Sequence, residues 1–223
     1  MKFSTFLLGG VAFLGLSSAA FAADLIISQP VPSTVLSSGT DWSGFYAGGH
    51  VGYGWGDWDY SGTYEPGPTP FTRRGEPEGW LAGVQVGHNW QVDNVVFGLQ
   101  ADLDLAGIEV ANPSGANDSL DAFGTLSGRV GLALGSMLPY VKLGAGIGSA
   151  TGVWQGGEEA HAGAYGWVAG AGLEVAVTDS VSAFVEYDYI GFKTDTFEFT
   201  TASGRVDVEG SLQTVKAGLN FRF

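Results

Sequence analysis

Hydrophobic and polar residues alternate strictly over the last stretch of the chain, Leu212 to Phe223. A β-strand points successive side chains to opposite faces, so this pattern predicts an extended strand with one apolar and one polar face. A chain end in water usually frays into polar residues, whereas this stretch ends on an aromatic residue. We therefore expect its apolar face to lie in lipid and its polar face to line a lumen.

Seven further stretches show the same alternation. In each of them apolar residues occupy one parity, while glycine, amide or charged residues occupy the other. Each has roughly the 9 to 11 residues that cross a bilayer as a tilted strand. These predicted strands are Gly44 to Gly56, Gly79 to Gln91, Val95 to Leu105, Leu120 to Gly135, Tyr140 to Ala150, Tyr165 to Val177 and Val181 to Gly191.

The connections between these stretches alternate between long and short. The long ones are Asp57 to Glu78, Ala106 to Ser119, Thr151 to Gly163 and Phe192 to Glu209. The short ones lie at Val92 to Asn94, near Ser136 to Pro139, and at Thr178 to Ser180. The last long connection keeps partial alternation, so its flanking strands are expected to project beyond the bilayer. A soluble β-sandwich also has short alternating strands, but it has no reason to gather all long loops at one end. We predict an all-β, eight-stranded antiparallel up-and-down transmembrane β-barrel with both termini at the short-turn end.

The N-terminus has the pattern of a targeting segment. Lys2 precedes an apolar stretch that ends in the small-x-small sequence Ala20-Phe21-Ala22, which predicts a signal peptide over residues 1–22. Residues 23–43 are rich in Pro, Ser and Thr and are predicted to be a flexible periplasmic leader, with the barrel over residues 44–223. Past the N-terminus no uncharged apolar run approaches the ~18 residues of a membrane helix.

The amino-acid composition limits the classes of partner and of chemistry that we expect. Twenty-three acidic residues against nine basic ones give a net charge of −14, which argues against binding nucleic acid. The absence of cysteine excludes disulfides and thiolate chemistry. The partners we expect are outer-membrane lipid, the barrel-assembly machinery, and an extracellular ligand or host surface.

Charged residues on the predicted inward face are expected to form a hydrogen-bonded network in the lumen, because unpaired charges are unfavourable in a narrow interior. They are Asp102, Asp104, Arg129, Lys142, Glu174, Glu186, Asp188, Lys216 and Arg222. The network is interpreted as a structural plug, with an ion path as the alternative, since eight strands enclose little more than their own side chains. Replacing Glu186 together with Arg222 is expected to distinguish the two.

Aromatic residues near strand ends are expected to form belts at the membrane interfaces, with stacking on an aromatic ligand as the alternative. They are Trp42, Trp55, Trp80, Trp90, Trp167, Tyr140, Tyr165, Tyr187 and Tyr189.

The three histidines give no convincing active site. His50 and His88 have no evident serine or carboxylate partner in the sequence, so we predict no catalytic residues, no metal site and no cofactor. His161 follows two glutamates in a long connection, which leaves a weak metal or heme contact open.

Four segments carry a family resemblance: GFYAGGHVGYGWG, GVQVGHNWQ, LSGRVGLALGSMLPYVKLGAG and the terminal VKAGLNFRF. Over Trp42 to Phe223 the chain resembles the small outer-membrane β-barrel family of alphaproteobacteria, which includes porin-like surface antigens and heme-binding surface proteins. The resemblance implies that the terminal aromatic signal, Leu219, Phe221 and Phe223, is read by the barrel-assembly machinery. It fixes no single activity and transfers no site.

We predict a structural, surface-exposed outer-membrane protein that is not an enzyme, supports envelope integrity, and contacts its surroundings through four extracellular loops. The alternatives are a small ion-conducting porin-like channel and a heme- or other ligand-binding surface protein. A lipid-modifying barrel enzyme would need a Ser/His or carboxylate/His group at the outer rim.

Overall fold

The computed structural model describes residues 39–64, 69–110, 118–153, 159–194, 197–199 and 204–223. Its ten strands are β1 (Gly44–Tyr64), β2 (Thr69–Gly75), β3 (Glu78–Val92), β4 (Val95–Val110), β5 (Asp118–Leu132), β6 (Met137–Val153), β7 (Glu159–Ala176), β8 (Val181–Thr194), β9 (Phe197–Phe199) and β10 (Gly204–Arg222). In the described part of the chain, no helix has the length and hydrophobicity needed to span a membrane. The predicted signal peptide lies outside the described residues.

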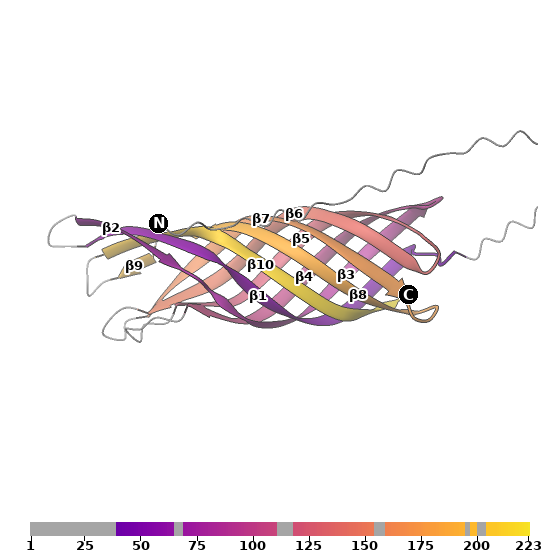
Figure 1. Cartoon of the computed structure of the whole chain (residues 1–223), viewed down its shortest axis with the longest axis horizontal. Helices are drawn as coiled ribbons and strands as arrows, with labels where there is room; N and C mark the ends of the chain where they lie inside the picture. Colours follow the sequence, from indigo (N-terminus) through magenta and orange to yellow (C-terminus); the bar gives the residue numbers. More distant parts are fainter. Residues whose placement is uncertain (1–38, 65–68, 111–117, 154–158, 195–196, 200–203) are drawn as a thin grey trace, which may run out of the picture. The chain divides into compact units, whose positions relative to one another are not determined.

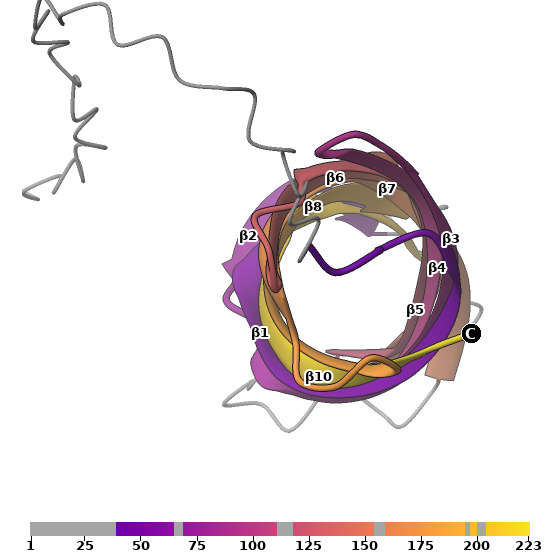
Figure 2. The same cartoon turned by 90° about the vertical axis from the view of Figure 1, so that its right-hand side faces the viewer.

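Eight strands, all except β2 and β9, close into one antiparallel barrel, which confirms the predicted fold class (Figure 1). Each pairs with the next along the chain, and β1 closes the ring against β10 from Tyr46 opposite Arg222 to Thr63 opposite Arg205. Figure 2 shows the resulting ring from one end. Strands β2 and β9 pair with β1 and β10 where these two run beyond the others.

Three short turns join strands at one end of the barrel, as predicted. Asp93, with φ of 54°, lies in the left-handed region that a two-residue hairpin turn needs, between β3 and β4. The turn between β5 and β6 lies earlier than predicted: Gly135 (φ 67°) occupies it, and Pro139 is already paired within β6. We call this end the short-turn end and the opposite one the long-connection end.

The strands are longer than predicted, because parts of the expected long connections continue the barrel wall. On β1 the expected connection begins at Asp57, yet the strand runs to Tyr64. There the alternation is inverted: Trp58 and Tyr60 are buried inside, whereas Asp57 and Asp59 point outward and are exposed. Beyond the lipid the outer face meets water, so polar residues move outside and apolar residues move inside. The outer face is apolar only within the lipid, so a prediction based on an apolar outer face places the strand ends too early.

Two apolar clusters fill the ends of the interior. The outer core, at the long-connection end, comprises Trp58, Tyr60, Leu81, Ile108, Val110, Leu120, Phe123, Ala150, Ala162, Val168, Ile190, Val208 and Leu212. The inner plug, at the short-turn end, comprises Trp42, Val96 and Leu138. Between them most inward side chains are polar or charged, so the candidate site lies between two apolar layers.

Candidate functional site

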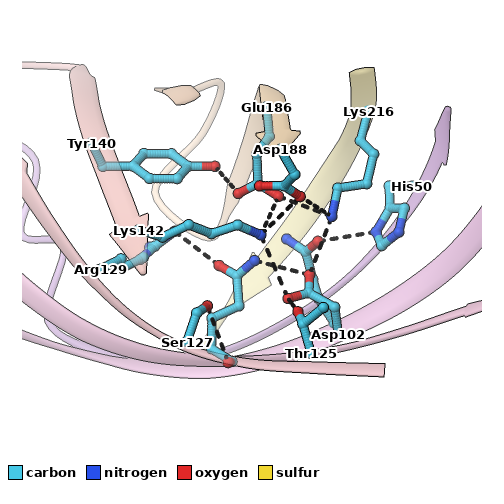
Figure 3. Close-up of polar contacts among 12 residues, drawn as sticks. His50, Asp102, Thr125, Ser127, Arg129, Tyr140, Lys142, Glu186, Asp188 and Lys216 are labelled. Atoms are coloured by element: carbon cyan, nitrogen blue, oxygen red, sulfur yellow. Dashed lines mark hydrogen bonds and ion pairs between the residues drawn. The ribbon is translucent and has the colours of Figure 1, made fainter. Parts of the chain in front are cut away.

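The centre of the interior is a cluster of two lysines and three carboxylates (Figure 3). Lys142 Nζ lies 2.7 Å from Glu186 Oε1 and 3.1 Å from Asp188 Oδ2. Lys216 Nζ lies 3.0 Å and 2.8 Å from the same two oxygens, and Asp102 lies 3.8 Å from each ammonium group. These side chains, from β4, β6, β8 and β10, meet because the closed barrel directs them all to one axis. We call this group the lysine–carboxylate cluster.

A second cluster, centred on Arg129, lies in the lumen between the lysine–carboxylate cluster and the inner plug. The Arg129 guanidinium lies between the rings of Tyr46 and Tyr140, 4.6 and 4.9 Å from their centroids. Its Nη1 donates to Glu174 Oε2 at 3.1 Å, and Tyr140 donates to Glu186 Oε2 at 2.8 Å. Tyr140 therefore joins the two clusters. An arginine between two aromatic faces gains cation–π attraction that is strongest where water is excluded.

A glycine makes room for this tyrosine. A Cβ at Gly172 would lie 2.5 Å from Tyr140 Cζ, so a larger residue on β7 would displace the ring. Glycine at an inward position thus leaves space for a long side chain from a neighbouring strand.

Neutral polar residues, which charge alone did not single out, complete the network. Gln100 accepts from Tyr46 and donates to Asp102 Oδ1, and Thr125 donates to Asp102 Oδ2. His50 lies 2.6 Å from Asp104. The expectation that His50 lacks a carboxylate partner was therefore wrong. Inward parity could have identified these residues, but only barrel closure shows which of them meet.

Eight of the nine predicted lumen residues lie in this interior; the ninth, Arg222, is separate. Its guanidinium donates to the carbonyl oxygens of Asp41, Thr178 and Asp179, and lies 4.7 Å from the Trp42 ring centroid. It therefore holds the segment before β1 against a turn at the short-turn end.

This contact corrects two further expectations. Trp42 is 1% exposed and packs inside the barrel, so it belongs neither to an interface belt nor to a flexible leader. Its backbone N–H donates to Gln91 Oε1 at 2.9 Å. Figure 2 shows the segment before β1 crossing the end of the ring. Residues 39–43 thus close the short-turn end, while residues 23–38 lie outside the described part.

Replacing Arg222 with methionine should reduce the free energy of unfolding by about 2 kcal/mol, because one cation–π contact and charged hydrogen bonds disappear. Urea unfolding of the refolded barrel measures the loss. Because Arg222 and Glu186 contact different residues, their substitutions should act additively. Strong coupling between them would contradict this geometry.

The other belt aromatics divide by parity. Six of them are exposed on the outer face, as predicted: Trp55, Trp80, Trp90, Trp167, Tyr165 and Tyr187. Tyr189 is partly buried against Trp167, with ring centroids 5.4 Å apart. Tyr140 was wrongly assigned, since it shares the inward parity of Lys142 and is buried.

The outer rim at the long-connection end brings together a carboxylate, a hydroxyl and an imidazole. Thr151 donates to Asp121 Oδ2 at 2.7 Å and lies 3.0 Å from His161 Nδ1. The single hydroxyl proton points to Asp121, so His161 does not stand as a general base toward Thr151. No group of three metal-ligating side chains occurs among the described residues. On β2, which pairs with β1, the hydrogen bond to Asp59 raises the pKa of Arg74.

The three residues of the predicted assembly signal are exposed on the outside of the barrel, two of them on β10 and Phe223 directly after it. Leu219, Phe221 and Phe223 are 57%, 50% and 76% exposed. The Phe223 N–H donates to the Phe45 carbonyl oxygen, which ties the chain end to β1. Their side chains are thus free to contact lipid or another protein.

Comparisons with known proteins agree with this architecture. The family described as "Outer membrane protein beta-barrel domain" matches residues 9–223. The chain is similar to a 25 kDa outer-membrane immunogenic protein of Brucella abortus biovar 1, with 33% identity over 95% of this chain and 94% of that protein. It is also similar to a 22 kDa outer membrane protein of Rhizobium leguminosarum bv. viciae, with 29% identity over 82% and 78% of the two chains.

Among solved structures, the fold resembles the outer membrane protein OprG from Pseudomonas aeruginosa. The TM-score is 0.60 at 14% identity, covering 83% of this chain and 98% of that one, so the likeness concerns the fold alone. The resemblance seen in the four sequence segments is confirmed. The chain belongs to the outer membrane protein β-barrel domain family, and it is a protein of the bacterial outer membrane.

Proposed function

We propose that this protein is a closed, structural barrel that reinforces the outer membrane and presents its four long connections to the surroundings. The lysine–carboxylate cluster carries the proposal. The side chains of Lys142, Glu186, Lys216 and Asp188 are at most 1% exposed and occupy the centre of the lumen. Each of these four charges has an opposite charge within hydrogen-bonding distance. This favours a charge network that fills the lumen over an ion path.

The layers on either side support this proposal. An ion leaving the charged centre would meet the outer core in one direction and the inner plug in the other. Beside the outer core, a cavity lined by Phe123, Thr125 and Ile190 measures only about 30 Å³. Such a space holds a water or two, and its apolar lining does not favour a hydrated ion.

Single-channel recording tests the proposal. Refolded chain from residue 23 onward, shown to be folded by its heat-dependent gel shift, should give no conductance steps in a planar bilayer. Reproducible cation-selective steps from folded protein would overturn the closed barrel and favour the porin-like alternative. The double variant Arg129→Ala/Tyr140→Ala serves as a comparison, because it shortens both side chains that cross the lumen beside the cluster. Steps in this variant alone would identify the interior as the barrier.

Ligand binding at the outer rim is a second candidate function. Because Thr151 gives its proton to Asp121, the Nδ1–H of His161 donates to Thr151, which leaves Nε2 of this exposed side chain with a free lone pair. An absorbance titration with heme tests this role. A spectral change lost in His161→Ala would support it, and identical titrations of both proteins would reject it.

We also infer that the terminal aromatic signal directs assembly. Changing Phe223 to serine should leave most of the protein outside the outer membrane, in a form without a heat-dependent gel shift. The matched control is Phe45→Ser, because Phe45 is likewise exposed on the outer face at the short-turn end. Equal assembly of the Phe223→Ser variant and the unmodified protein would refute a signal at this position.

A further inference from the structure

His50 lies at the end of a chain of hydrogen bonds whose directions can be assigned. This series of hydrogen bonds begins at Glu174. An ionised carboxylate has no hydrogen to donate, so Glu174 accepts from Arg129, Ser182 and Asn220. Asn220 thus directs its Nδ2 to Glu174. Its Oδ1 is left to accept from another residue.

The next amide is fixed in the same way. Gln85 Nε2 donates to Asn220 Oδ1 at 2.7 Å, so Gln85 Oε1 must accept. The atom that faces it is His50 Nδ1, at 3.0 Å. His50 Nδ1 therefore carries a proton.

The other ring nitrogen faces a carboxylate. His50 Nε2 lies 2.6 Å from Asp104 Oδ1, and both side chains are fully buried. Two lone pairs would repel at this distance, so a proton must lie between them. Histidine is ordinarily the stronger base of the two, which places this proton on His50.

The charge of the interior agrees with this assignment. Among the described residues, Arg222 apart, the inward cations are Arg129, Lys142 and Lys216, against the five carboxylates Asp102, Asp104, Glu174, Glu186 and Asp188. Three cations against five anions leave an excess of two negative charges. A second proton on His50 halves this excess, and a smaller net charge is favoured where water is excluded.

We propose that His50 and Asp104 form a proton-binding site, which keeps His50 as an imidazolium ion at neutral pH. Around the ring, β3 contributes Gln85, β4 contributes Asp104, and β8 contributes the Phe184 ring at 6.3 Å. On β10 the register partner of His50 is Gly218. The nearest charges along β8 and β10, Glu186 and Lys216, pair with each other, which leaves Asp104 as the counter-ion.

Nitrogen NMR of histidine-labelled protein tests the site directly. The full chain from residue 23, folded in detergent, is measured at about pH 7.5, one unit above the usual histidine pKa of about 6.5. The signal assigned to His50 by its loss in His50→Gln should show protons on both ring nitrogens. A ring with one unprotonated nitrogen would overturn the proposal. This measurement on the unmodified protein does not depend on whether the barrel conducts ions.

The variant Asp104→Asn tests the role of Asp104. In this variant the His50 ring should lose its second proton under the same conditions, because the amide cannot act as a counter-ion. Retention of both ring protons would contradict the assignment of Asp104 as the partner.

Discussion

Replacing Lys216 with methionine should lower the free energy of unfolding of the barrel by about 3–5 kcal/mol. Lys216 lies within 3.0 Å of both Glu186 and Asp188. Without it, the two buried carboxylates would share Lys142 as their nearby cation, and no water could replace the lost charge. Urea titration of the protein refolded in lipid vesicles, analysed by linear extrapolation, measures the change.

The matched control is Lys193→Met. Lys193 also pairs with a glutamate, Glu209, but both side chains are exposed, so no measurable change is expected. A compensating variant, Lys216→Met with Asp188→Asn, should regain part of the stability because it removes one unpaired charge. Unchanged stability of Lys216→Met would show that the cluster does not hold the interior together.

Replacing Ile108 with alanine should lower the free energy of unfolding by about 2–5 kcal/mol, because it opens a cavity in the outer core. Ile108 has no exposed surface. Its packing is tight, since a Cβ added at Gly54 on β1 would lie 2.8 Å from Ile108 Cδ1. The same urea titration measures the effect.

The neighbouring substitution Glu109→Ala is the control, since Glu109 lies on the exposed outer face of the same strand. It should leave stability unchanged within error. Equal stability of Ile108→Ala and the unmodified protein would mean that the strands beyond the lipid are not packed around a core. The inverted alternation described for β1 would then have no energetic role.

Residue parity predicted much of the candidate site. Asp102, Lys142 and Glu186 follow the inward parity of their strands, and parity alone was enough to place them in the lumen. Tyr140 has the inward parity of Lys142, so parity correctly predicts a buried side chain, whereas the general preference of tyrosine for membrane interfaces predicts the wrong place. The pairing of Asp104 with His50 could not be predicted, because it depends on the register between β1, β3 and β4.

The sequence by itself determined the number of barrel strands, the end that carries the short turns and the lipid-facing residues, because alternation and turn residues are local properties of a chain. The tertiary structure alone decided where the wall continues beyond the lipid, since the same alternation is inverted there. It alone placed Trp42 inside the barrel and separated Arg222 from the lysine–carboxylate cluster. These contacts join residues distant in the chain, and only closure of β1 against β10 fixes the distances between them.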